Sequence, residues 1–124
     1  MDTRIENVSG YANYYGLQYG GCFDDLDALR EKMSREEEFI TRSPKRRKLL
    51  IDLNKTNITK KMISEFMSHL ERMAPKIIKL AATGEWKYLR PVGKTLQKSK
   101  VIGKGQMYFD VDIEECKTWL VGKR

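Results

Sequence analysis

The sequence has few of the residues from which metal sites, disulfides or catalytic centres are usually assembled. Its 124 residues include two cysteines, Cys22 and Cys116, and one histidine, His69. Neither cysteine belongs to a CxxC pair, and a single histidine cannot complete a Cys/His zinc set. We therefore predict that the protein carries no metal and no cofactor.

Long apolar runs are also lacking. No stretch approaches the ~18 apolar residues that are needed to span a bilayer. The first ten residues contain Asp2 and Glu6 and no apolar run, so we expect no signal peptide. These features predict a cytoplasmic protein with reduced thiols.

Phosphate-binding loops are missing as well, because neither GxxxxGK[ST] nor GxGxxG occurs. The run Gly93-Lys94-Thr95 is similar to the end of a Walker loop. However, Tyr88 stands where that loop requires its first glycine. The sequence therefore gives no support to a nucleotide-hydrolysing enzyme of this class.

Basic residues outnumber acidic ones, by 24 to 17, which gives a net charge of +7. Such a charge favours encounter with nucleic acid or with an anionic surface. Basic groups occur at residues 45–48, 60–61 and 94–104, but acids such as Glu65 and Glu85 separate them. Nucleic-acid or anionic-surface binding is therefore the alternative function, and a lysine-rich solvated surface explains the same charges.

The centre of the chain, residues 48–73, predicts a strand, a turn and a helix. The apolar run of residues 49–53 is interrupted only by Asp52, which is typical of a strand buried on both faces. Thr59 is placed to cap the helix that follows. That helix has one apolar stripe at three- and four-residue steps: Met62, Ile63, Phe66, Met67, Leu70 and Met73.

The remaining elements alternate in type around this centre. The predicted elements are strands at 3–8 and 11–19, a helix from Asp24 that frays before Phe39, a strand at 77–82, a short helix from Pro91 to Lys98, a strand at 106–109, and a last helix from Asp110 or Asp112. The two leading strands predict an antiparallel hairpin. The whole order predicts one α/β domain over residues 1–124, with the hairpin followed by alternating β-α units. We expect a mostly parallel sheet of four to five strands and about four helices.

Three stretches carry a resemblance to a known family: KLLIDLNKTNIT with its helix, APKIIKLAATG, and the ending from Phe109 through DIEECKTWL. They resemble the STAS domain, named for sulfate transporters and anti-sigma-factor antagonists, and especially its stand-alone bacterial, SpoIIAA-like relatives. The resemblance implies a STAS fold and a regulatory role in binding a protein partner or a small ligand.

One family feature is missing from this sequence. Anti-sigma-factor antagonists carry an Asp-Ser-Ser/Gly-Gly-Leu type motif with a phosphorylated serine at the start of the central helix. Here residues 58–62 read ITKKM, without serine or glycine. Thr56 or Thr59 could receive a phosphate, although the spacing singles out neither.

Candidates for catalytic chemistry are few. We expect His69 at the margin of the apolar stripe, at the edge of the core or facing solvent. Cys22 follows two glycines and is expected to be exposed, whereas Cys116 lies in the apolar line of the last helix. Asp52 is expected to bond the amides of the following loop. The sequence therefore predicts a binding protein rather than an enzyme.

If a binding site exists, we expect it beyond the carboxyl ends of the parallel strands, where connections diverge in open α/β sheets. The residues there are Asp52, Asn54, Thr56, Asn57, Thr59, Thr83, Glu85 and Trp86. The alternative is that these are ordinary turn residues. We predict a non-enzymatic cytoplasmic domain that binds a protein partner or a small ligand at these loops, and a homodimer is compatible with the sequence.

Overall fold

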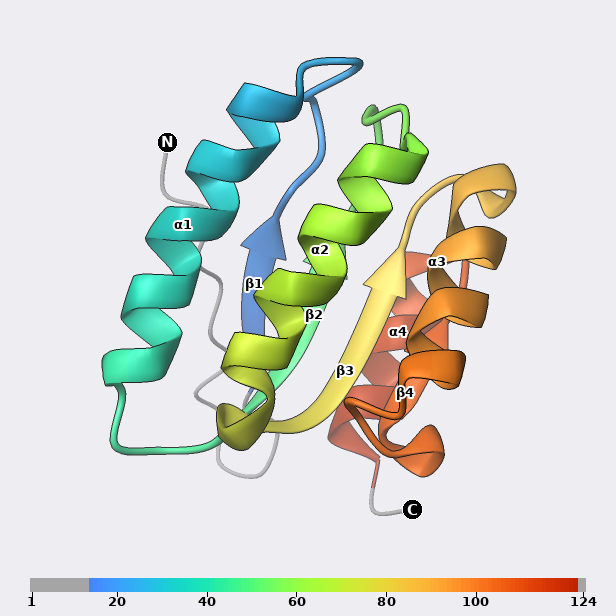
Figure 1. Ribbon diagram of the computed structural model, residues 1–124. Helices are drawn as coiled ribbons and strands as arrows, with labels where there is room; N and C mark the ends of the chain where they lie inside the picture. Colours follow the sequence, from blue (N-terminus) through green and yellow to red (C-terminus); the bar gives the residue numbers. More distant parts are fainter. Residues whose placement is uncertain (1–13, 123–124) are drawn as a thin grey trace.

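The computed structural model describes residues 14–122, which form a four-stranded sheet and four α-helices (Figure 1). The elements are β1 (Tyr15–Gln18), α1 (Leu26–Arg42), β2 (Arg47–Asp52), α2 (Lys60–Met73), β3 (Ile77–Thr83), α3 (Trp86–Ser99), β4 (Met107–Phe109) and α4 (Ile113–Val121), with short 3-10 turns at Ala74–Lys76 and Lys104–Gln106. The predicted α/β class, with alternating strands and helices, is confirmed.

Every pairing in the sheet is parallel, and the strand order is β1-β2-β3-β4. Leu49 of β2 lies opposite Tyr15 of β1 and Leu80 of β3, so β2 has a partner on each side. Helices α1, α2 and α3 cover one face of the sheet and α4 covers the other (Figure 1). All described strands therefore end at the same edge, the upper edge in Figure 1.

The predicted hairpin is only partly within the described residues. Its first strand, at 3–8, lies outside them. The second expected strand, 11–19, corresponds to β1, which spans Tyr15–Gln18 and pairs with β2 in parallel.

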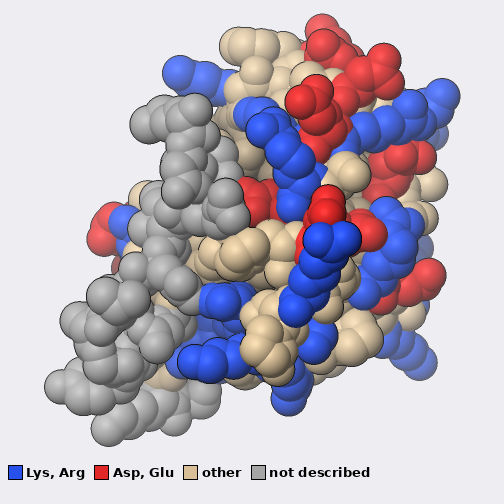
Figure 2. Space-filling model, turned by 90° about the vertical axis from the view of Figure 1, so that its left-hand side faces the viewer, with Lys and Arg blue, Asp and Glu red and all other residues tan. Residues whose placement is uncertain are grey.

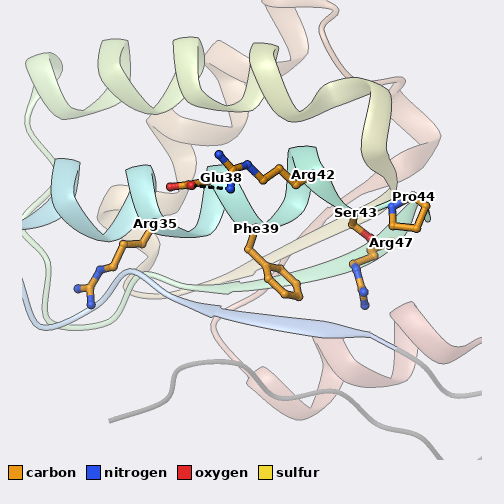
Figure 3. Close-up of a pocket in the computed structure, with 7 residues that line it drawn as sticks. All are labelled: Arg35, Glu38, Phe39, Arg42, Ser43, Pro44 and Arg47. Atoms are coloured by element: carbon orange, nitrogen blue, oxygen red, sulfur yellow. Dashed lines mark ion pairs between the residues drawn. The ribbon is translucent and has the colours of Figure 1, made fainter.

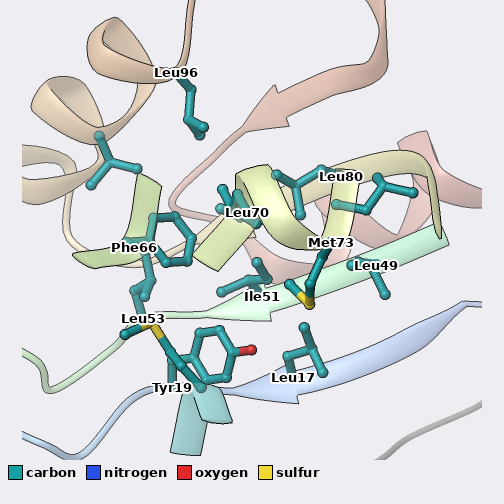
Figure 4. Close-up of a cluster of buried hydrophobic side chains, with 14 of the residues drawn as sticks. Leu17, Tyr19, Leu49, Ile51, Leu53, Phe66, Leu70, Met73, Leu80 and Leu96 are labelled. Atoms are coloured by element: carbon teal, nitrogen blue, oxygen red, sulfur yellow. The ribbon is translucent and has the colours of Figure 1, made fainter. Parts of the chain in front are cut away.

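The core has two layers because apolar side chains leave β2 and β3 on both faces. Leu49 and Ile51 point to the side of α1–α3, whereas Leu50 points to α4. On the larger side, Phe66 and Leu70 of α2 pack over the sheet (Figure 4). The uninterrupted apolar run of the sequence is thus explained by burial on both faces.

Helix α1 differs from its prediction at both ends. Its N-cap is Asp25, not Asp24, and the Asp25 carboxylate accepts a hydrogen bond from the amide of Ala28. The helix does not fray before Phe39 but continues to Arg42. The prediction was wrong because Ile40 is buried and the Phe39 ring stacks on Tyr15, at 5.0 Å between centroids. These tertiary contacts stabilise the highly charged last turns.

Helix α3 begins at Trp86, whereas the sequence predicted a short helix from Pro91. Pro91 therefore lies inside the helix, where it provides no amide hydrogen for an intrahelical bond. Leu89, Val92 and Leu96 are buried on one side of α3. Their burial explains why the helix tolerates an internal proline.

Candidate functional site

The carboxyl edge of the sheet is built by two loops that continue the pairing of β1 with β2. The Tyr19 amide donates to the Asp52 carbonyl and the Gly21 amide to the Asn54 carbonyl, each at 2.9 Å. Further out, the Phe23 amide bonds the Lys55 carbonyl and the Asn57 amide bonds the Phe23 carbonyl, at 2.9 and 2.8 Å. The loop after β1 is therefore fixed to the loop after β2 by backbone hydrogen bonds.

This close approach depends on Gly20. A Cβ atom at that position would stand 2.1 Å from the Asn54 carbonyl oxygen, a distance that the backbone cannot accommodate. The structural role of Gly20 is to let the two loops touch.

Three of the predicted site residues, Asp52, Asn54 and Thr56, make hydrogen bonds within these loops. Asp52 accepts hydrogen bonds from the Asn54 amide and the Asn54 side chain, both at 2.9 Å, so its expected role in the turn is found. The Thr56 hydroxyl is buried, donates to the Tyr19 carbonyl at 2.8 Å and accepts from the Cys22 amide at 3.1 Å. Thr56 thus holds the β1 loop rather than facing solvent.

Asn57 connects three elements. Its side-chain amide donates to the Asp24 carboxylate at 2.9 Å, and its side-chain oxygen accepts from the Tyr88 hydroxyl at 3.1 Å. Asp24 belongs to the loop after β1, and Tyr88 belongs to the first turn of α3. Asn57 therefore brings the loops after β1, β2 and β3 into one surface.

The other predicted residues have different environments. The Thr59 hydroxyl accepts from the Met62 amide at 3.1 Å, which confirms it as the N-cap of α2. The Thr83 side chain is fully buried, and its hydroxyl has no hydrogen-bond partner among the described residues. Glu85 is the exposed N-cap residue of α3, and Trp86 begins that helix with 52% of its surface exposed.

Phe23 is a member of this edge that the sequence analysis did not single out. Its side chain is 59% exposed, and its backbone has φ of 50°, in the left-handed region that a bulky residue rarely adopts. Lys55, its hydrogen-bond partner in the facing loop, also has a positive φ, of 63°. An aromatic residue after Gly20-Gly21-Cys22 was the only hint in the sequence, and it did not reveal the backbone conformation.

Exposed apolar side chains gather at this edge. Phe23, Trp86 and Val111 are three of the four large apolar side chains that the described residues leave most exposed. They lie in the loop after β1, at the start of α3 and in the loop after β4, all at the carboxyl ends of strands. We call Phe23 and Trp86 the aromatic edge. Asn57 links the segments that carry them, because its backbone amide binds the Phe23 carbonyl and its side chain binds Asp24 and Tyr88.

His69 is not at the margin of the core, as predicted, but fully buried. One ring nitrogen, Nε2, lies 2.7 Å from the Tyr19 hydroxyl, and Nδ1 lies 2.9 Å from Glu37, which also binds Arg72 at 2.8 Å. Burial lowers the pKa of His69, although Glu37 partly opposes this effect. The prediction failed because the partners Tyr19 and Glu37 come from the loop after β1 and from α1, and a helical wheel of α2 contains neither.

Both cysteines are buried and free. This corrects the expectation that Cys22 is exposed: it is enclosed where the Thr56 hydroxyl binds its amide. Cys116 is buried beneath α4, as predicted, and burial raises the pKa of its thiol to about 12. The Cys116 thiol therefore stays protonated at neutral pH.

Between residues 14 and 122 no group of three or more His, Cys, Asp or Glu side chains is arranged to hold a metal ion. Within the same residues no helix has the length and apolar character that crossing a bilayer would take.

Comparison of the chain with known protein families, with curated proteins and with solved structures finds no match to any of them. The class of this protein is therefore given by its fold, an α/β domain with a parallel four-stranded sheet. Its function must be argued from its own surface.

Proposed function

We propose that the protein is a non-enzymatic, cytoplasmic binding domain of the regulatory kind that its STAS-like sequence implies, and that the aromatic edge docks a protein partner. The observation that carries this proposal is Phe23, an exposed aromatic side chain held in a left-handed backbone conformation. Left-handed backbone costs a non-glycine residue about 1–2 kcal/mol, and exposure gains nothing for folding. Strain of this kind is typical of functional positions.

The polar residues at the edge favour a protein partner over a small ligand. Hydrogen bonds within the loops already occupy polar side-chain groups of Asp52, Thr56 and Asn57. The exposed part of the edge includes two aromatic side chains, Phe23 and Trp86, on segments that Asn57 links through Asp24 and Tyr88. Exposed aromatic side chains on rigid supports are frequent centres of protein–protein interfaces.

Burial of the candidate reactive groups supports a non-enzymatic role. His69, Cys22 and Cys116 are each enclosed in the core. An acid–base or nucleophilic group must reach the substrate to act. These three side chains cannot do so without opening the fold.

The proposal is tested with the variants Phe23→Gly and Trp86→Ala. Glycine adopts positive φ without strain, so Phe23→Gly should leave the melting temperature unchanged or raise it. Capture from native lysate measures how much partner protein each variant retains. With each edge variant this amount should be about tenfold or more below that of the wild-type chain, as expected for residues at the centre of an interface. The matched control is Ile78→Ala, another exposed apolar residue, at the start of β3.

The capture experiment also has results that contradict the proposal. A partner retained by both edge variants, or lost equally with Ile78→Ala, would show that the aromatic edge is not the docking surface. Capture of no protein by the wild-type chain would overturn it too. If the captured protein is a second copy of this chain, the partner is a homodimer subunit, and sedimentation of the same variants must show dissociation.

A further inference from the structure

A cavity of about 500 Å³ lies at the other end of α1, where the helix turns into β2 (Figure 3). Its lining comes from the last turns of α1, the connecting loop and the first residue of β2: Arg35, Glu38, Phe39, Arg42, Ser43, Pro44 and Arg47. Small-molecule sites have volumes of about 300–1,000 Å³. The cavity therefore has the size for a small organic ligand.

The cavity is separate from the aromatic edge. Helix α1 has 17 residues, from the carboxyl edge of the sheet to the start of β2. At about 1.5 Å per residue, roughly 25 Å lies between its two ends. A ligand here would not touch Phe23 or Trp86.

One wall of the cavity is aromatic and rigid. The Phe39 ring stacks on Tyr15 with an angle of 11° between the planes. The Arg47 guanidinium lies 5.5 Å from the centre of the Phe39 ring and 5.3 Å from that of Tyr15. Figure 3 shows Phe39 and Arg47 projecting side by side from α1 and β2. A flat apolar group can pack against this wall with little loss of side-chain freedom.

The charge of the cavity is positive. Three arginines and one glutamate line it, and Lys45 and Arg46 follow directly in the loop. Arg42 is paired with Glu38 at 3.0 Å and Arg35 with Glu31 at 3.8 Å, and all four side chains are largely exposed. Exposed pairs of this kind contribute little, so a ligand anion can replace the carboxylates. Guanidinium groups bind carboxylate and phosphate through paired hydrogen bonds.

We propose that this cavity binds a small aromatic anion, with its ring against Phe39 and its carboxylate or phosphate at Arg35 and Arg42. The aromatic wall and the arginine rim recognise the two parts of such a molecule. Glu38 competes with the ligand for Arg42 and repels the bound anion. Loss of Glu38 should therefore strengthen binding, whereas loss of Arg42 should weaken it.

The test is a titration of the isotope-labelled full chain, followed by backbone amide chemical shifts. The probes are 1-naphthyl phosphate and 1-naphthoate, with inorganic phosphate and neutral 1-naphthol as the separate parts. We expect shifts around residues 35–47 with an aromatic anion, and weaker binding of either part. The phosphate and carboxylate probes decide which acid group the site prefers.

The variants give effects of opposite sign. Arg42→Gln should weaken binding of the preferred aromatic anion about two- to fivefold, and Glu38→Gln should strengthen it by a similar factor, as expected for exposed charges. The matched controls are Arg90→Gln and Glu71→Gln, exposed residues on α3 and α2 with the same charge changes. Both controls should leave the affinity unchanged.

Several results would overturn the site. The first is that no aromatic anion binds, and the second is that the chemical-shift changes centre away from residues 35–47. The third is that Arg42→Gln and Arg90→Gln weaken binding equally, because the affinity would then depend only on the net charge of the protein. Phe39→Leu adds a test of the aromatic wall, because it should reduce the preference for naphthyl phosphate over inorganic phosphate. None of these results depends on whether a protein docks at the aromatic edge.

Discussion

At the scale of single residues, Thr59 combines a role in folding with a predicted role as a phosphorylation site. Its hydroxyl caps α2 by accepting from the Met62 amide. Its side chain is exposed, whereas the hydroxyl of Thr56 is enclosed between two loops. Of the two threonines that could receive a phosphate, only Thr59 is accessible in this conformation.

Thr59→Ala should lower the free energy of unfolding by about 0.5–2 kcal/mol, because the Met62 amide loses its acceptor. Thr59→Asp should retain most of the stability, since aspartate is an equally good N-cap. Urea denaturation of the two variants measures both effects. An equal loss in the two variants would show that the cap contributes nothing.

Thr59→Asp also tests regulation, because it places a negative charge where a phosphate would stand. If Thr59 only caps the helix, partner capture by the aromatic edge should be the same as for the wild-type chain. Loss of the partner with unchanged stability would instead indicate a phosphorylation switch at Thr59.

His69 makes stability depend on pH. The groups that face its ring are Tyr19 from the loop after β1, Glu37 from α1 and Arg72 from α2, and burial lowers its pKa in the folded protein. A histidine in the unfolded chain takes up its proton near pH 6.5, at about its ordinary pKa, before the folded one does. The contribution of His69 is therefore complete above about pH 6.5 and is lost as the pH falls towards the folded pKa.

The corresponding measurement is the free energy of unfolding at about pH 7.5 and about pH 5.5. Stability should be lower at the acidic value, and His69→Gln should flatten that difference because it removes the titrating group. Burial acts to raise the pKa of Glu37, but hydrogen bonds from Arg72 and His69 outweigh it and lower that pKa. Glu37 therefore adds a loss of stability only at lower pH, below about 4.5. If the difference in the free energy of unfolding between the two pH values is unchanged in His69→Gln, groups other than His69 cause the pH dependence.

At the scale of elements, α2 connects the sequence pattern most directly with the fold. Phe66 lies in the middle of its apolar stripe, is buried, and meets the Tyr19 ring edge-on at 6.3 Å. The same helix provides the His69 ring and the Thr59 cap. Helix α2 therefore fixes the end of β1 as well as the sheet beneath it.

Phe66→Ala should lower the free energy of unfolding by about 3–5 kcal/mol, the usual cost of emptying an aromatic core site. That is a large part of the ~5–15 kcal/mol available to a domain of this kind. Ser68→Ala, at an exposed position of the same helix, is the control and should change stability by less than about 0.5 kcal/mol. Comparable losses in both variants would contradict the assigned buried face.

At the scale of the whole molecule, the net charge of +7 comes from 24 basic and 17 acidic residues. Figure 2 shows basic and acidic side chains interleaved over the face that it displays. Some of the basic groups are also paired with acids, as Arg30 is with Glu65 at 2.9 Å and Arg72 with Glu37 at 2.8 Å. This distribution favours local recognition of anions over binding along a nucleic-acid backbone.

Binding to a fluorescent DNA duplex should therefore be weak at low salt and lost near physiological salt, at about 0.15 M. The salt dependence of its affinity should be shallow, because few phosphates are neutralised at once. Fluorescence anisotropy over a salt series measures both quantities. Tight binding with a steep dependence, equivalent to about six or more phosphates, would instead revive the nucleic-acid function that the composition suggests.

The sequence by itself determined the α/β class, the cap at Thr59, the buried face of α2 and a buried strand, which was expected from the apolar run at residues 49–53 and spans Arg47–Asp52 in the structure. These features depend on the period of apolar residues and on hydrogen bonds between near neighbours in the chain, and both can be read locally. The edge where the predicted polar residues lie also followed from the parallel order of the strands. The turn role of Asp52 was also predictable, because its hydrogen-bond partner lies in the loop that directly follows it in the sequence.

Only the tertiary structure decided the length of α1, the burial of His69 and Cys22, and the left-handed conformation of Phe23. Each depends on groups far away in the sequence: Tyr15 stacks on Phe39, Tyr19 and Glu37 enclose His69, and the Lys55 carbonyl fixes the Phe23 amide. The cavity at Arg42 and Arg47 likewise forms only when α1 packs beside β1 and β2. Contacts between distant segments leave no period in the sequence, so the fold alone reveals them.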